Sequence, residues 1–149
     1  MRPFRTAHGI ATGLIAAAAT GGALVGFGLR FGTPARPFNA LAGYILGPAT
    51  LAIWQFSFVT IVGIAVHVIA DTLVGVAFVA LVARVGRTEI GWALLLAATA
   101  FGISWASAGA LGVGLGTLLS IRDRIVLGVV LAAALPLGMR FALSVLRRD

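Results

Sequence analysis

His67 and Asp71 are the residues of this sequence best suited to chemistry, because a group that titrates near neutral pH accompanies a carboxylate. They stand four residues apart near the middle of the apolar run 57–83, so a helix would stack them on one face. A carboxylate at the centre of a bilayer costs about 2.5–3.5 kcal/mol on insertion scales. Asp71 is therefore expected to have either a polar partner or a function.

Three roles are open to this pair. As a candidate proton relay, both groups would carry protons in a transporter or channel. As a candidate ligand, His67 would bind the metal of a haem or pigment while Asp71 orients its ring. As a structural tie, the pair would hydrogen-bond two helices for about 0.6 kcal/mol. His8 is not expected to complete a haem site with His67, because a rise of ~1.5 Å per residue places the two at different depths.

The composition indicates what surrounds these residues. Of the 149 residues, 60% are hydrophobic and only 10% are charged, too few to cover a soluble fold. We therefore predict an integral membrane protein with one transmembrane domain over residues 1–149. The net charge of +7 comes from arginines at the ends of apolar runs, which suit lipid headgroups rather than nucleic acid. The absence of Cys excludes disulfides and thiolate metal sites.

The predicted fold is an all-α, four-helix membrane bundle. A bilayer crossing needs ~20 apolar residues, and residues 40–56 are too short and too interrupted by Gly47-Pro48 for a comfortable one. We expect this segment to be interfacial or re-entrant, between the first two spans; a fifth span is the alternative. The first span is expected to be retained, although its basic start also resembles a signal peptide. The predicted spans are 8–29, 57–83, 90–111 and 125–146.

Small residues recur every four positions in these spans and predict close helix packing. A small side chain lets a neighbouring backbone approach, and glycines flank the central pair in the same register. We expect these stripes to line helix contacts, with Gly102 packed more tightly than Ala97. The predicted packing residues are Gly9, Gly13, Ala17 and Gly21 in the first span, Gly63 and Gly75 in the second, and Ala98, Gly102, Ala106 and Ala110 in the third.

The arginine distribution predicts the orientation. With four spans, seven arginines lie near the side of the two chain ends and four near the other side. Because cytoplasmic loops carry the excess of Arg, both termini are expected in the cytoplasm and the protein in the inner membrane.

No sequence motif indicates catalysis. The two serines of the third span lack a nucleophile elbow, and there is no metal-binding motif of the H-E-x-x-H type. We therefore predict no catalytic residues, no metal site, no bound cofactor and a non-enzymatic accessory or structural role. The alternatives are a proton-coupled transporter or channel component using His67 and Asp71, and a haem- or pigment-binding subunit. The expected partners are the lipid bilayer and either further copies of the chain or a larger membrane complex.

Overall fold

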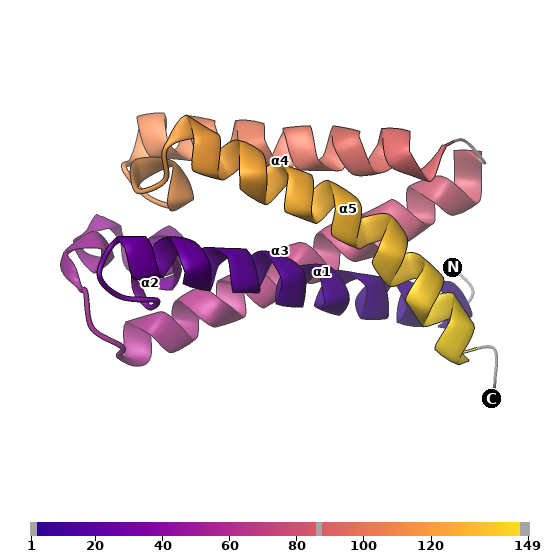
Figure 1. The fold of residues 1–149 in the computed structure, drawn as a ribbon, viewed down its shortest axis with the longest axis horizontal. Coiled ribbons are helices and arrows are strands. Elements are labelled where there is room, and N and C mark those ends of the chain that lie inside the picture. Colours follow the sequence, from indigo (N-terminus) through magenta and orange to yellow (C-terminus); the bar gives the residue numbers. More distant parts are fainter. Residues whose placement is uncertain (1–2, 86–87, 147–149) are drawn as a thin grey trace.

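The computed structural model describes residues 3–85 and 88–146, which form an all-helical bundle without strands (Figure 1). The four predicted spans each coincide with one long helix, so the predicted fold class is confirmed. The helices are α1 Pro3–Arg30, α2 Arg36–Leu46, α3 Phe58–Val85, α4 Glu89–Leu111 and α5 Ile121–Leu146, with 3-10 turns η1 Pro48–Ala52 and η2 Leu115–Thr117.

The outer surface of the bundle is apolar, as a bilayer requires. Large aliphatic side chains point outward along the long helices, for example Leu73, Leu94 and Leu137, each more than half exposed. In water such a surface would be unstable, whereas lipid tails are as apolar as these side chains. Together with four helices long and apolar enough to cross a membrane, this surface identifies a multi-pass membrane protein.

The helices α1 and α3 cross in backbone contact at glycines. A Cβ atom at Gly9 would come within 2.7 Å of the Cα of Val76, and one at Gly13 would collide with the backbone of Thr72. On α3, Gly75 faces Gly13 directly, so neither position has room for a side chain. The predicted packing residues of the first span therefore lie in the interface between α1 and α3.

The stripe of α4 is different, and the prediction for it was wrong within this chain. Ala98, Gly102, Ala106 and Ala110 are all exposed, and a Cβ atom at Gly102 would meet nothing within 4 Å. The buried face of α4 carries Ala93, Ala97 and Ser107 instead. The reason is that α4 packs chiefly against α5 along this other face, while its small stripe points away from the bundle.

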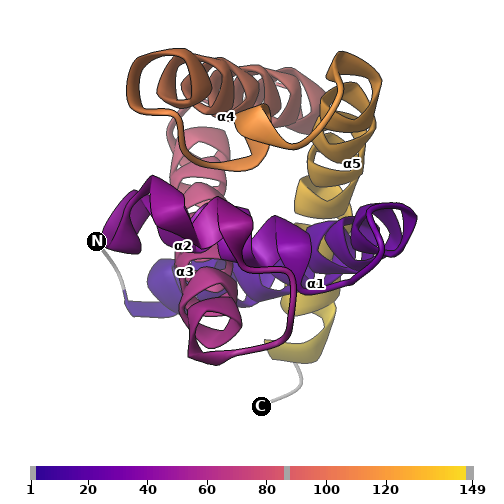
Figure 2. The same ribbon diagram turned by 90° about the vertical axis from the view of Figure 1, so that its left-hand side faces the viewer.

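The segment between α1 and α3 lies across one end of the bundle (Figure 2). Asn39 is completely buried there, and its amide donates hydrogen bonds to the carbonyls of Ile53 (2.7 Å) and Gln55 (3.3 Å). Its carbonyl accepts a hydrogen bond from Thr60 on α3 at 2.7 Å. Asn39 thus lies within α2 and holds the chain that follows this helix against α3.

Arg122, Asp123 and Arg124 lie in the first turn of α5, which begins at Ile121. The backbone N–H of Asp123 donates to the hydroxyl of Ser120 at 3.2 Å, and that hydroxyl donates to the Asp123 carboxylate at 2.8 Å. This reciprocal cap starts the helix earlier than the predicted residue 125. Asp123 also pairs with Arg30, which ties the end of α1 to the start of α5.

Candidate functional site

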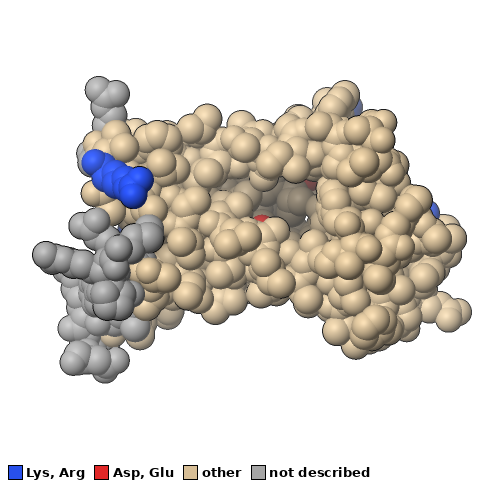
Figure 3. Space-filling model, turned by 180° about the vertical axis from the view of Figure 1, so that it is seen from behind, with Lys and Arg blue, Asp and Glu red and all other residues tan. Residues whose placement is uncertain are grey.

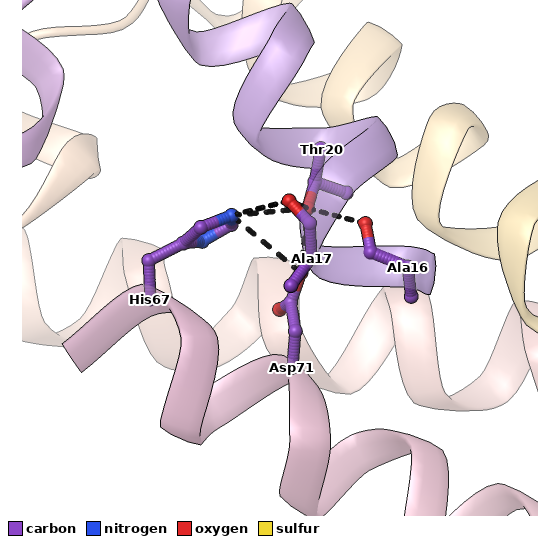
Figure 4. Close-up of polar contacts among 5 residues, drawn as sticks. All are labelled: Ala16, Ala17, Thr20, His67 and Asp71. Carbon is purple, nitrogen blue, oxygen red and sulfur yellow. Dashed lines mark hydrogen bonds and ion pairs between the residues drawn. The ribbon is translucent and has the colours of Figure 1, made fainter. Parts of the chain in front are cut away.

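His67 and Asp71 lie where α3 passes α1, and Figure 4 shows the residues of α1 that meet them. His67 Nε2 donates to the carbonyl of Ala17 at 3.1 Å and lies 3.2 Å from the hydroxyl oxygen of Thr20. That hydroxyl lies 2.5 Å from Oδ2 of Asp71, and the His67–Asp71 distance between Nε2 and Oδ2 is 3.8 Å. We call Thr20, His67 and Asp71 the polar cluster.

The glycine crossing explains why the polar cluster forms. Gly13 and Gly75 bring the two backbones together one to two turns away, so the short side chain of Thr20 reaches Asp71. Gly21 packs beside the imidazole, since a Cβ atom there would lie 3.4 Å from His67 Nε2, at van der Waals contact. Close helix approach and polar contact are therefore parts of one arrangement.

Thr20 can serve Asp71 in either protonation state. A hydroxyl has one proton to donate, and here two acceptors compete for it: Asp71 Oδ2 and the carbonyl of Ala16 at 2.8 Å. If Asp71 is ionised, the hydroxyl donates to the carboxylate. If Asp71 is protonated, the carboxylic acid donates to Thr20, and Thr20 turns its proton to Ala16. The hydroxyl of Thr20 therefore keeps a hydrogen bond with Asp71 whether the carboxyl group is ionised or protonated.

A cavity of about 310 Å³ adjoins the polar cluster. Its walls are mostly aliphatic and aromatic, and Thr20, His67 and Asp71 supply polar groups on the side of α1 and α3. The helices α3 and α4 diverge from their connecting turn, as Figure 1 shows, and have few contacts elsewhere. The view from behind shows a hollow between them with acidic atoms inside (Figure 3).

The far end of the cavity carries a positive charge. Arg124, in the first turn of α5, lines the cavity, and its guanidinium carbon lies 4.8 Å from the ring centre of Trp105 and 5.6 Å from that of Phe101. Tyr44 and Ser104 add hydroxyl groups to the wall. The cavity therefore has the composition of a ligand site: mostly apolar, with a few polar groups.

This geometry does not favour the binding of a metal or cofactor at His67. Within residues 3–85 and 88–146, no three His, Cys, Asp or Glu side chains cluster as a metal site would need. A metal bound at His67 Nε2 would break the hydrogen bond to Ala17, and α1 already packs against that edge of the ring. His8 is buried on α1, more than three turns before Thr20, and lines no part of the cavity.

Comparisons with family models, curated proteins and solved structures give no match for this chain. The geometry itself is thus the basis for a functional conclusion.

Two members of this site were not singled out from the sequence. Thr20 lies seven residues after Gly13, and since seven residues make two helical turns, the hydroxyl is on the same face as the small stripe. That spacing could have indicated it as the partner of Asp71. Arg124 resembled an ordinary headgroup anchor, and no sequence pattern marks it as a cavity residue.

Proposed function

We propose that this protein binds a small, largely apolar molecule from the bilayer in its lateral cavity and couples that binding to protonation of Asp71. In this role it acts as a proton-coupled transporter or as the binding component of one. The observation that carries the proposal is that the polar cluster borders an open cavity rather than being sealed between helices. A mere structural tie has no need of a cavity beside it.

The cavity supports the binding half of this proposal. Its volume of about 310 Å³ lies at the lower end of the ~300–1,000 Å³ found for small-molecule sites. Residues of both α3 and α4 line the cavity, and Asp71 on its wall is midway along the 28 residues of α3. Lipid-soluble molecules are concentrated at that depth, and they would reach the site without crossing a headgroup layer.

The hydrogen bonds of Asp71 support the second part of the proposal, that this carboxylate binds and releases a proton. Only Oδ2 is engaged by Thr20, and Oδ1 accepts no hydrogen bond from the residues that the structure describes. The carboxylate lines the cavity, so a bound molecule or a water can exchange a proton with it. The imidazole of His67, whose Nε2 lies 3.8 Å from Oδ2 of Asp71, is a second group that can carry a proton beside this carboxylate.

A structural role for the same residues is the second candidate. Its support is that His67 and Asp71 both bond to α1, through the Ala17 carbonyl and the Thr20 hydroxyl. In that case the protein would be a non-enzymatic accessory subunit, and its cavity would hold only lipid tails.

Two matched substitutions on α4 separate these candidates. Ala100 lines the cavity, whereas Ala98 is exposed two residues away on the same helix. Ala100→Phe should fill the cavity and deplete small molecules that copurify with the protein, measured by mass spectrometry of extracts. Ala98→Phe should leave them in place. Equal extracts from both variants would contradict the binding proposal.

The proton half is tested by infrared spectra of the purified protein recorded over a range of pH. A carboxylic acid carbonyl band should grow as pH falls, and Asp71→Asn should remove it because an amide does not titrate. If the spectra of Asp71→Asn and wild type change identically with pH, Asp71 does not bind the proton.

We also propose that the protein lies in the inner membrane. The end of the bundle that holds the start of α1 and the end of α5 would face the cytoplasm (Figure 1). The excess of arginines on that side supports this orientation. Single cysteines at Thr33 and Thr117 should react with an impermeant thiol reagent from outside intact cells. Cysteines at Thr88 should react only after permeabilisation. The reverse pattern would invert the orientation.

A further inference from the structure

Arg124 is a positive charge on the cavity wall that no carboxylate of the described residues neutralises. Arg30 pairs with Asp123, and Arg140 pairs with Glu89 at 3.1 Å. Arg36 also stacks on aromatic rings without a carboxylate partner, but among the described arginines only Arg124 lines the cavity. Arg124 is held only over the rings of Phe101 and Trp105, and its buried Nε has no hydrogen-bond partner. A guanidinium in such a site can bind an anion that is not part of the chain itself.

The two ends of the cavity differ in charge, with Arg124 near one end and Asp71 near the other. On α5 the lining residues run from Arg124 to Leu131, about 10 Å at the helical rise, and on α3 from Val66 to Val74, about 12 Å. Arg124 belongs to the first turn of α5, close to headgroup depth, whereas Asp71 is at the middle of α3. The rest of the wall is mostly apolar, and its other polar residues are Thr20, Tyr44, His67 and Ser104. A molecule with a charged head and an apolar body would match this cavity, with the head at Arg124 and the body along the apolar wall.

We infer that the molecule bound in the cavity is a single-chain anionic amphiphile, with its anionic group on the Arg124 guanidinium and its chain extending toward Asp71. This inference rests on the proposed function and names its ligand class. A guanidinium binds carboxylate, sulfonate or phosphate oxygens through two parallel hydrogen bonds. The small volume of the cavity favours one chain over the two chains of a membrane phospholipid.

The charges on the cavity wall also give the sign of the coupling. The charged or titratable groups that line it are Tyr44 from α2, His67 and Asp71 from α3, and Arg124 from α5, while α1 and α4 provide the hydroxyls of Thr20 and Ser104. An ionised Asp71 repels a bound anion, and protonation removes that repulsion. Proton and anion therefore favour each other's binding. Two like charges on the order of 10 Å apart at an effective dielectric of ~20 change affinity by about tenfold.

The test uses probes whose charge does not change with pH. The full-length protein in phosphatidylcholine nanodiscs is titrated with labelled decanesulfonate, decanol or decyltrimethylammonium, and binding to empty nanodiscs is subtracted. We expect decanesulfonate to bind most tightly, with affinity about tenfold higher at pH 5 than at pH 8. Asp71→Asn should bind decanesulfonate with the high affinity throughout and lose most of the pH dependence.

Arg124→Gln is the decisive variant, and Arg122→Gln is its matched control, since Arg122 is exposed and lines no part of the cavity. Arg124→Gln should weaken decanesulfonate at least about tenfold and leave decanol unchanged, because a charge-assisted hydrogen bond is lost. Arg122→Gln should bind as wild type does. If Arg124→Gln does not fold, Arg124→Lys keeps the charge without the fork and should lose several-fold in affinity.

Other outcomes overturn the inference in separable ways. Equal binding of the three probes, or equal effects of the two Gln variants, would show that Arg124 recognises no anion. If Ala100→Phe still prevented the probes from binding, the proposed cavity site would stand without the anion site. Displacement of decanesulfonate by phosphatidylglycerol in the nanodisc would assign Arg124 to a lipid headgroup instead of a single-chain ligand. Charge-selective binding without any pH dependence would support the anion site and contradict the coupling to Asp71.

Discussion

Small residues at the same spacing have opposite roles in two regions of this bundle, the interface between α1 and α3 and the helix α4. Between α1 and α3, glycine meets glycine and the backbones touch, with the polar cluster beside the crossing. On α4 a stripe of the same spacing faces outward, and the inner face borders the cavity. A stripe thus packs only where the opposite helix also lacks side chains and where polar groups hold the two together.

The helix α4 packs against α5 along its buried face, and polar side-chain contacts hold it near its two ends. Tyr44 of α2 and Ser107 of α4 share a hydrogen bond of 2.7 Å at one end. At the other end Glu89 pairs with Arg140 of α5. The middle of α4 leaves space on the side of α3, which is where the cavity lies. This difference between a tight interface and an open one predicts how substitutions on the two sides will compare.

The largest effect is expected at the glycine crossing. Gly13→Leu places a side chain where the backbone of Thr72 already lies, so α1 must move away from α3. We expect a loss of about 3 kcal/mol or more in the free energy of unfolding, measured by thermal unfolding in detergent. Gly22→Leu on the same helix has open space and should change stability by less than about 0.5 kcal/mol. Similar losses in both variants would mean that the crossing is not the tight contact.

A smaller effect is expected on α4, and it distinguishes the two faces of that helix. Ala93 is 1% exposed within the core, whereas Ala98 is exposed. Ala93→Leu should cost about 1–3 kcal/mol by overpacking, and Ala98→Leu less than about 0.5 kcal/mol. The same detergent assay applies. A greater loss for Ala98→Leu would mean that the outward stripe is packed against a partner in the purified protein.

The hydrogen bond between Tyr44 and Ser107 tests the end fastening of α4. Tyr44→Phe removes the hydroxyl and should cost about 1 kcal/mol, since the bond joins two partly buried side chains. Ser107→Ala supplies the second arm of a double-mutant cycle. The two effects should be less than additive, because each single change already removes the shared bond. Full additivity would argue that the two hydroxyls act independently.

The smallest effect on stability is expected at the polar cluster. Asp71→Asn keeps an oxygen that accepts the hydrogen bond of Thr20 and removes a charge that is costly in lipid. Unfolding free energy should stay within about 1 kcal/mol of wild type or rise. Thr20→Val, which deprives both His67 and Asp71 of a partner, should be less stable than Asp71→Asn. The opposite order would mean that the charge of Asp71 itself stabilises the fold.

Several features of this protein follow from its sequence alone. Four apolar runs of spanning length, separated by arginines and Gly-Pro breaks, suffice to predict four helices and the short segment between the first two. The placement of His67 and Asp71 on one face of the second long helix also follows, because helical spacing is local. So does the small stripe of α1, since it includes the glycines that α3 mirrors in the same register.

Only the tertiary structure decided which faces meet. In water an apolar stripe marks the side of a helix that packs, but in a bilayer the lipid is as apolar as the interior, so that signal is lost. For this reason the stripe of α4 could not be assigned to lipid, nor Ala93 to the core, from spacing alone. The cavity and the charged groups on its wall were likewise decided only by the tertiary structure. Thr20, Asp71 and Arg124 are 51 and more residues apart where they converge, and only the crossing of α1, α3 and α5 brings them to one space.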